Sequence, residues 1–211
     1  MPTLYFLEGG VAVGKSTLLE TIQKHLDCQV VHEPLDVWTR VRDGHGKNLL
    51  EKFYEDPKAH AYAFQSFAFM SRAKIVGQLQ LDKPVVLIER SVHSDKLFAE
   101  NCYETGLMSE LEWNLYGLWY DWIVAELWAL RGDCTVRHIY LRCSPTLALE
   151  RLKRRRRREE ESIDPRYLAR LHEKHDERFK ESDDTWVFDA ETDAETLAAR
   201  IAARITLASN A

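Results

Sequence analysis

The sequence contains few cysteines, and their spacing does not suggest a metal site or a crosslinked scaffold. None of them lies in a C-x-x-C pair, which argues against zinc binding and against a small secreted fold held by disulfides. We expect reduced thiols in the core or at the surface. The four positions are Cys28, Cys102, Cys134 and Cys143.

Long apolar runs and targeting signals are also missing. No uncharged stretch approaches the ~18 to 20 apolar residues that a membrane span needs. The first ten residues, MPTLYFLEGG, lack the basic n-region of a secretory signal and the arginine-rich pattern of a transit peptide. These absences predict a cytoplasmic protein without a membrane partner.

The chain as a whole lacks the excess of positive charge that bulk nucleic-acid binding requires. Its 29 Lys and Arg against 34 Asp and Glu give 29 − 34 = −5, so we expect no nucleic-acid partner. Residues 151–158 differ, because they read RLKRRRRR and seven of the eight are basic. Without those seven, the remainder carries 22 − 34 = −12. Taken alone, the run would also suit a nucleic-acid patch or a nuclear localisation signal.

The apolar residues that are present form alternating strand and helix patterns. An apolar run at 3–7 ends at a glycine loop, and Lys15 opens a helical pattern that continues to Leu26. Further strands are expected at 29–32, 85–88, 135–141 and 185–188. Further helices are expected at 47–55, 58–80, 92–103, 109–131, 145–158, 165–181 and 193–207. This alternation predicts one α/β domain, residues 1–211, whose mainly parallel sheet is covered by helices on both faces.

Three glutamates end or directly follow the first three predicted strands. They are Glu8, Glu33 and Glu89. Ligands of such sheets bind beyond the carboxyl ends of the strands, so we expect the three carboxylates to meet in one crevice.

The glycine loop matches the phosphate-binding pattern G-x-x-x-x-G-K-[ST] and lies between a strand and a helix, the context that this motif needs. Its backbone N–H groups and the start of the helix would bind phosphate. Lys15 would reach the β- and γ-phosphates, and the Ser16 hydroxyl would ligate Mg²⁺. The predicted donor-binding residues are Gly9, Gly10, Val11, Ala12, Val13, Gly14, Lys15, Ser16 and Thr17.

The loop leaves the phosphoryl acceptor open, as either water or a second substrate. A regulatory GTPase would need an Asp after the third strand and an N-K-x-D motif, and neither is present. The arginine-dense segment, about 151–164, fits a lid that excludes water from the phosphoryl group, as a kinase requires.

Six motifs then resemble one known family along nearly the whole chain. They are LEGGVAVGKST, HEPLDVW, NLLEKFYEDP, FQSFAFMSR, ERSVHSD and RRRRREE. In this order and spacing they are similar to the deoxynucleoside kinases of the deoxycytidine, deoxyguanosine and insect multisubstrate type. The resemblance implies a P-loop kinase fold with a five-stranded parallel sheet and an arginine-rich helical lid. It also implies transfer of the γ-phosphate of ATP, or of UTP or GTP, to the 5′-hydroxyl of a deoxynucleoside in nucleotide salvage.

The resemblance also implies the catalytic roles. Glu33 matches the general base, although a Glu before Pro at a strand end could merely cap a loop. Glu89 would hold Mg²⁺ with Ser16, and Arg90 would bridge the 5′ oxygen and the phosphoryl group, unless Glu89 and Arg90 form only a buried ion pair. The phosphate-clamping arginines would be Arg151, Arg155 and Arg157, whose planar guanidinium groups suit phosphoryl oxygens.

Substrate recognition follows from the same resemblance. Tyr54 and Glu160 match the residues that bind the sugar 3′-hydroxyl, and Gln65 matches the side chain that reads the base edge. Aromatic walls would come from Trp38, Phe64 and Phe98. One residue is missing between Asp95 and Phe98 relative to the family, and Gly10 and Val13 replace its usual Asn and Ala.

Arg72 and Asp95 bear on substrate choice. In the deoxycytidine and deoxyguanosine kinases an Arg and an Asp at these positions bind each other near the base, whereas thymidine-accepting relatives carry an apolar and a small residue. Ala68 also follows the deoxycytidine type. We therefore expect a kinase for deoxycytidine and purine deoxynucleosides that handles thymidine poorly. The alternative is an ordinary surface ion pair.

The predicted helix at 109–131 carries four of the six tryptophans and is apolar nearly all round, which indicates burial on more than one side. A homodimer through the 58–80 and 109–131 helices, as in the family, would explain this.

Two rival functions stay open. Thymidylate kinase shares the loop and an arginine lid, but its Arg-Glu-Pro-Gly-Gly is here HEPLD and its Asp-Arg-Tyr is here ERS. A nucleotide-dependent nucleic-acid-binding or regulatory protein would use the arginines as a phosphate patch.

Overall fold

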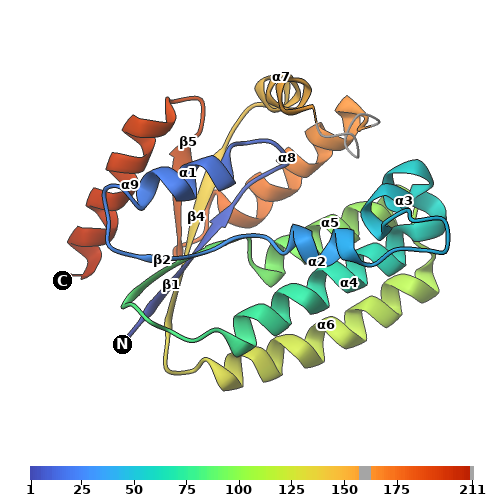
Figure 1. Ribbon diagram of the computed structural model, residues 1–211, viewed down its shortest axis with the longest axis horizontal. Helices are drawn as coiled ribbons and strands as arrows, with labels where there is room; N and C mark the ends of the chain where they lie inside the picture. The colour runs from blue at the N-terminus through green and yellow to red at the C-terminus, as the bar shows by residue number, and fades with distance from the viewer. Residues whose placement is uncertain (157–162, 210–211) are drawn as a thin grey trace.

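The computed structural model describes residues 1–156 and 163–209. The predicted α/β architecture is confirmed, with five strands and the helices alternating along the chain (Figure 1). The elements in order are β1 (Thr3–Glu8), α1 (Lys15–Ile22), β2 (Gln29–Val31), α2 (Leu35–Arg40), α3 (Leu49–Glu55), α4 (Pro57–Gln78), β3 (Val85–Glu89), α5 (Val92–Glu104), α6 (Glu110–Leu130), β4 (Thr135–Arg142), α7 (Pro145–Arg155), α8 (Pro165–Phe179), β5 (Thr185–Asp189) and α9 (Ala194–Ser209).

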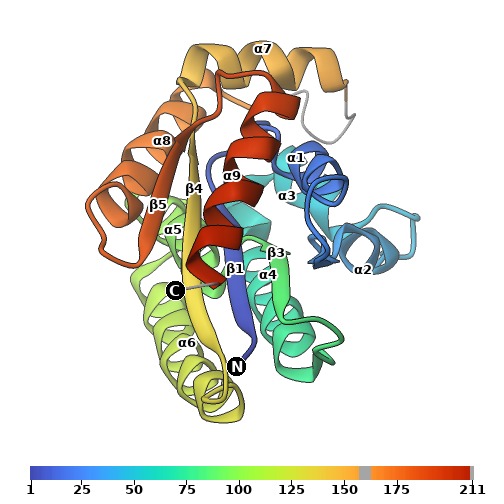
Figure 2. The same ribbon diagram turned by 90° about the vertical axis from the view of Figure 1, so that its left-hand side faces the viewer.

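The five strands form one sheet in the order β2-β3-β1-β4-β5, and every neighbouring pair is parallel. Helices α1 and α9 cover one face, whereas α4, α5 and α6 lie on the other (Figure 1). Helix α7 lies beyond the carboxyl ends of the strands, across the edge where ligands bind in this class of sheet (Figure 2).

Successive residues of β1 point into the two core layers, as the two-residue period of a strand requires. Leu4 and Phe6 pack in the layer that contains α4 and α6. Tyr5 and Leu7 pack in the layer that contains α1 and α9. Burial of each such side chain contributes roughly 1.5 to 3 kcal/mol, so the strand that leads into the glycine loop is held firmly from both sides.

The larger differences from the sequence-based expectation concern α1, α2 and α7, while other element ends differ by at most two residues. Helix α1 ends at Ile22 rather than near Leu26, and turn-type hydrogen bonds follow it. The short helix α2 was not expected, because six residues after a proline are too few to show a helical period. Helix α7 ends at Arg155, where Arg156 adopts a left-handed conformation with φ 51°. The predicted lid over about 151–164 stays a prediction, since residues 157–162 lie outside the described ranges.

No described helix has both the length and the apolar character that crossing a bilayer requires. The four cysteines are free, as expected; Cys28, Cys102 and Cys143 are buried, and Cys134 is partly exposed.

Candidate active site

The glycine loop folds tightly over the N-terminus of α1. Gly9 and Gly14 have φ values of 141° and 100°, which side-chain-bearing residues rarely adopt. A Cβ atom on Gly9 would also lie 2.8 Å from the carbonyl oxygen of Leu141 on β4, so only glycine fits there. Because α1 begins at Lys15, its first N–H groups and its positive dipole end face the loop. This geometry suits a phosphate group.

Two cations lie against the carbonyl groups of the loop. Lys15 donates from Nζ to the oxygens of Gly10 at 2.8 Å and Gly9 at 3.3 Å. Arg90 donates from Nη1 to Gly9 at 2.6 Å and from Nη2 to Gly10 at 3.1 Å. Burial and, to a smaller extent, the Arg90 charge lower the pKa of Lys15, Glu89 and Glu33 partly oppose them, and the resulting pKa is about 7. The negative charge of a bound phosphate donor would raise the pKa of Lys15 again, so that the ammonium group is protonated and pairs with the donor.

Ser16 and Glu89 place two oxygen ligands side by side at the mouth of the loop. The Ser16 hydroxyl donates to Glu89 Oε1 at 2.9 Å. No group of three or more His, Cys, Asp or Glu side chains within 1–156 and 163–209 could hold a metal ion. Two protein oxygens fit Mg²⁺ nevertheless, because that ion usually takes one or two protein ligands and completes its shell with phosphate and water.

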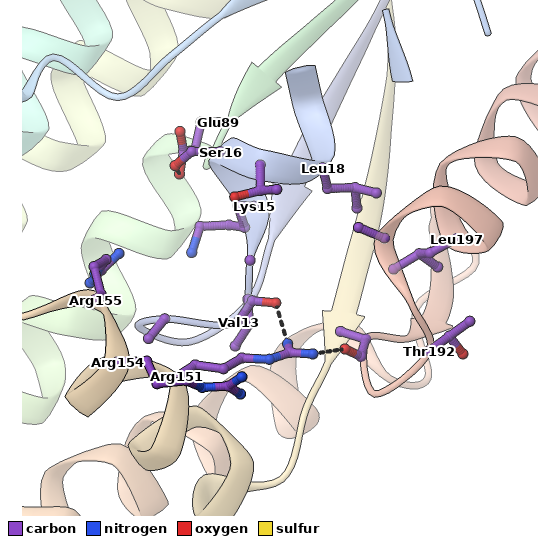
Figure 3. Close-up of a pocket in the computed structure, with 15 residues that line it drawn as sticks. Val13, Lys15, Ser16, Leu18, Glu89, Arg151, Arg154, Arg155, Thr192 and Leu197 are labelled. Carbon is purple, nitrogen blue, oxygen red and sulfur yellow. Dashed lines mark hydrogen bonds between the residues drawn. The ribbon is translucent and has the colours of Figure 1, made fainter. Parts of the chain in front are cut away.

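A cavity of about 550 Å³ opens beside the loop, as expected for the donor nucleotide (Figure 3). Its walls come from the loop and α1, from the end of β3, from α7, from the segment after β5 and from the start of α9. They include Ala12, Val13, Gly14, Lys15, Ser16, Thr17, Glu89, Arg151, Arg154, Arg155, Thr192 and Leu197. Gly9, Gly10 and Val11 are the predicted donor-binding residues that do not line it.

The α7 arginines approach this cavity in different ways. Arg151 donates from Nη1 to the carbonyl oxygen of Val13 at 2.9 Å and from Nη2 to that of Ala190 at 2.8 Å, so it ties the loop to the chain after β5 (Figure 3). Arg155 lines the cavity as predicted, and so does Arg154, which was not a predicted site residue. Arg157 lies outside the described residues, and its predicted role stays a prediction.

A second cavity adjoins the first and gathers the residues expected to bind the acceptor. Nine of the ten predicted substrate-binding residues line it: Glu33, Trp38, Tyr54, Phe64, Gln65, Arg72, Arg90, Asp95 and Phe98. The tenth, Glu160, lies outside the described residues. Lys15, Ser16, Glu89 and Arg155 line both cavities, so the two spaces meet at the glycine loop.

Glu33 lines the acceptor cavity and is held by two guanidinium groups. Its Oε1 lies 3.1 Å from Nε of Arg90 and 2.9 Å from Nη2 of Arg72. Burial alone raises the pKa of Glu33, but Arg90, Arg72 and Lys15 more than offset this and lower it to about 2. Glu33 is therefore a charged carboxylate facing the acceptor cavity. The structure pairs Arg90 with Glu33, and no described contact forms the Glu89–Arg90 ion pair that was the alternative.

Arg72 and Asp95 form a buried ion pair, with side chains only 3% and 6% exposed. Nε of Arg72 lies 2.7 Å from Asp95 Oδ2, and Nη1 donates to the carbonyl oxygen of Glu89 at 2.7 Å. Burial lowers the pKa of Arg72, but Asp95 and Glu33 more than offset this and hold it above its ordinary value. The alternative of an ordinary surface pair is wrong.

Helix α5 carries Asp95 and Phe98 three residues apart, and both line the acceptor cavity despite the missing residue. Residues at i and i+3 share one helix face, which explains why the shorter spacing keeps both in place. Two supporting groups, Cys102 and Ser71, were not expected at the site. Gln65 donates from Nε2 to Cys102 Sγ at 3.7 Å, and the Trp38 indole donates to Ser71 Oγ at 2.8 Å. No local sequence signal distinguishes these from ordinary core residues.

The expectation for Glu8 was wrong. Its side chain is fully buried and lines neither cavity. It accepts hydrogen bonds from the backbone of Ser91 and from the Ser94 hydroxyl, and it pairs with His138. Because residues alternate along a strand, Glu8 faces the same core layer as Leu4 and Phe6, so two of the three carboxylates, Glu33 and Glu89, line the acceptor cavity.

The fold and the site define a P-loop phosphotransferase, with a donor cavity at the glycine loop and an acceptor cavity beside it. The charged Glu33 carboxylate lines the acceptor cavity, and the cations Lys15 and Arg155 line both cavities. This arrangement suits phosphoryl transfer between two bound substrates.

The chain belongs to the deoxynucleoside kinase family, whose model matches residues 6–207. It is 36% identical over 206 residues to deoxycytidine kinase 2 of Gallus gallus, covering 87% of this chain and 73% of that relative. It is 38% identical over 191 residues to the deoxycytidine kinase of Mus musculus, covering 81% and 72%. The mitochondrial deoxyguanosine kinase of Xenopus laevis is 37% identical over 190 residues, covering 81% and 70%. The expected family is confirmed, and the protein is a deoxynucleoside kinase, a phosphotransferase with an alcohol acceptor, rather than a thymidylate kinase.

Proposed function

We propose that this kinase transfers the γ-phosphate of ATP to the 5′-hydroxyl of deoxycytidine and purine deoxynucleosides in preference to thymidine, with Glu33 as the general base. One observation carries the proposal. Glu33 is a charged carboxylate that lines the acceptor cavity together with Lys15 and Arg155, which also line the donor cavity. UTP and GTP are the alternative donors.

In the proposed step, the 5′ oxygen forms a bond to the γ-phosphorus while the bond from that phosphorus to the bridging oxygen breaks. The electron pair of the broken bond stays on the departing nucleoside diphosphate. Glu33 accepts the proton of the 5′-hydroxyl. A carboxylate with a pKa of about 2 is a weak base, and this fits a loose transition state in which the proton leaves late.

The cations around Glu33 supply the electrostatic part of catalysis. Lys15 and Arg155 line both cavities, and the Arg90 guanidinium reaches Glu33 as well as the loop. Positive groups fixed around the transferring phosphoryl stabilise its charge at no reorganisation cost. Arg151 and Arg157 stay predicted members of this set, and Arg151 additionally ties the loop to Ala190.

Ser16 and Glu89 are the residues that would hold Mg²⁺. When bound, the ion would neutralise charge on the donor phosphates. The 2.9 Å contact between the two side chains supports this assignment, because a hydroxyl and a carboxylate that already touch need little rearrangement to share one ion.

Substrate choice is proposed to depend on the Arg72–Asp95 pair. The pair is buried at the wall of the acceptor cavity, and both partners sit on long helices, α4 and α5. Gln65, also on α4, supplies an amide that can donate to and accept from a base edge. The relatives named above are deoxycytidine and deoxyguanosine kinases, which supports the same preference here.

We also propose a homodimer through α4 and α6. Large apolar residues of α6 are exposed, including Leu118 at 70%, Trp122 at 58% and Trp119 at 50%. An apolar groove between α4 and α6 lies beside them, lined by residues such as Phe67 and Met70. An exposed apolar patch of this kind marks an interaction surface.

The absence of a nucleic-acid partner and the cytoplasmic location stay predictions from the sequence.

Glu33→Gln tests the proposed base, with Glu20→Gln at an exposed position of α1 as the matched control. We expect kcat to fall by about 100-fold or more while the Kd of the deoxynucleoside changes little, because the amide keeps the shape and loses the basicity. The control should keep full activity. A Glu33→Gln protein with kcat close to the unaltered enzyme would overturn the assignment.

A further inference from the structure

Glu8 is a fully buried carboxylate directly before the glycine loop, and the proposed reaction does not use it. Its Oε1 lies 3.0 Å from Nδ1 of His138 on β4. Its Oε2 accepts a hydrogen bond from the backbone N–H of Ser91 at 3.4 Å and one from the hydroxyl of Ser94. Burial alone raises the pKa of Glu8, but His138, Ser91 and Ser94 more than offset this and hold it well below its ordinary value. A buried charge with this many donors is an ordered part of the structure.

Two of the groups that Glu8 binds, Ser91 and Ser94, belong to the segment that carries Arg90. Arg90 has a φ of 64°, a left-handed conformation that costs a residue with a side chain about 1 kcal/mol or more. Its backbone N–H donates to the carbonyl oxygen of Leu7 at 2.9 Å, and its guanidinium donates to Gly9. Leu7, Glu8 and Gly9 therefore each bind part of the segment that starts at Arg90.

We infer that Glu8 is a positioning residue for phosphoryl transfer. Its carboxylate, backed by His138, holds the Arg90–Ser94 turn so that the Arg90 guanidinium lies between the glycine loop and Glu33. Arg90 links Glu33 to the glycine loop, since its Nε is 3.1 Å from Glu33 Oε1 and its Nη1 is 2.6 Å from the Gly9 carbonyl oxygen. The inference rests on the proposed function, because it gives Arg90 and Glu33 their catalytic roles.

Glu8→Gln is the direct test, because the amide keeps the side-chain volume but replaces one accepting oxygen by an NH₂ group. That group would face the Ser91 N–H, the Ser94 hydroxyl or His138, where the carboxylate now accepts. The turn at Arg90 should then relax, and kcat should fall by about tenfold or more, since small displacements of catalytic groups are costly. The KM of the deoxynucleoside should stay within about twofold, because Gln65, the residue proposed to read the base edge, lies on α4 and makes no described hydrogen bond with Glu8 or the Arg90–Ser94 turn. His138→Leu should act in the same direction, since it leaves Glu8 Oε1 without its partner.

Tyr140→Phe is the matched control. Tyr140 is also buried on β4, and its hydroxyl donates to Asp176 at 2.7 Å, but it makes no described contact with the Arg90 segment. The control should lower the melting temperature and leave kcat unchanged. Equal fractional losses of kcat in Glu8→Gln and Tyr140→Phe would reduce Glu8 to a structural role and overturn the inference.

The outcomes separate this inference from the proposed function. An unaltered enzyme that phosphorylates no deoxynucleoside would contradict the proposed function itself. An active enzyme whose Glu8→Gln variant keeps its kcat would contradict only the inference. If Glu8→Gln does not fold, Ser94→Ala removes one donor and should lower kcat by about threefold with little change in KM. An unchanged kcat in Ser94→Ala would overturn the inference in that case.

Discussion

Removal of the Arg72 charge should destabilise the protein far more than removal of the whole Arg72–Asp95 pair. In Arg72→Met, Asp95 stays buried at 4% residue exposure and loses the partner that lies 2.7 Å away. Burial already raises the pKa of Asp95 to about 6 with Arg72 in place, so without Arg72 the carboxyl must either carry an uncompensated charge or take up a proton. Leaving one partner of a buried pair uncompensated costs about 3 to 5 kcal/mol. For a domain of this size, 3 kcal/mol corresponds to a fall in melting temperature of roughly 6 to 12 °C.

The double variant Arg72→Met with Asp95→Asn removes both charges at nearly constant volume. Its loss should be only about 1 kcal/mol, because apolar or neutral replacements of buried ion pairs are often close to neutral. Thermal and urea unfolding of the two variants and of Asp95→Asn alone complete a double-mutant cycle. A single variant that loses less than about 1 kcal/mol, the level of an exposed pair, would refute the reasoning. So would a double variant as unstable as the single one.

Three further predictions concern the donor site and the dimer. Because the pKa of Lys15 is lowered to about 7, the protonated fraction of Lys15 falls above pH 7, and kcat/KM for ATP should decline over the same range. The Lys15→Arg variant should show no such decline. A kcat/KM of the unaltered enzyme that stays constant up to pH 9 would contradict this prediction. Ser16→Ala should raise the Mg²⁺ concentration needed for half-maximal rate by about tenfold, and an unchanged Mg²⁺ dependence would exclude Ser16 as a ligand. Light scattering should give twice the 24.6 kDa chain mass for the unaltered protein and the monomer mass for Leu118→Glu with Trp122→Glu, and a monomeric unaltered protein would contradict the dimer.

Local patterns in the sequence were sufficient to predict most of the fold. The run at 3–7, the glycines after it and Lys15 predict strand, loop and helix, since Gly9 and Gly14 adopt conformations that only glycine tolerates well. Helix α2 was missed because its six residues bury only Trp38 and show no periodic face. The end of α7 was also missed, because the left-handed conformation of Arg156 has no signature within a run of arginines.

The site was predictable where a motif fixes the residue and not where packing decides its partner. Glu33, Arg72, Arg90 and Asp95 were expected near the acceptor, and one cavity contains them all. The bonds from Arg72 and Arg90 to one oxygen of Glu33 depend on how α4 and β3 pack, and no single segment encodes that.

Glu8 is a residue whose predicted location was wrong because its side-chain direction depends on packing. Its position at a strand end predicted a place in the crevice, but strand alternation directs it toward His138 and the start of α5. Side-chain direction at a strand end depends on the register of the sheet, which the sequence alone did not supply.

The most direct test of the central claim is a turnover panel with ATP as donor. The rates of 5′-phosphorylation would be measured for deoxycytidine, deoxyadenosine, deoxyguanosine and thymidine with the unaltered enzyme. The account predicts that deoxycytidine and the purine deoxynucleosides have the higher kcat/KM and that thymidine is a poor substrate, because the buried Arg72–Asp95 pair stands at the base-binding wall. Thymidine turnover equal to that of deoxycytidine and deoxyadenosine would contradict it.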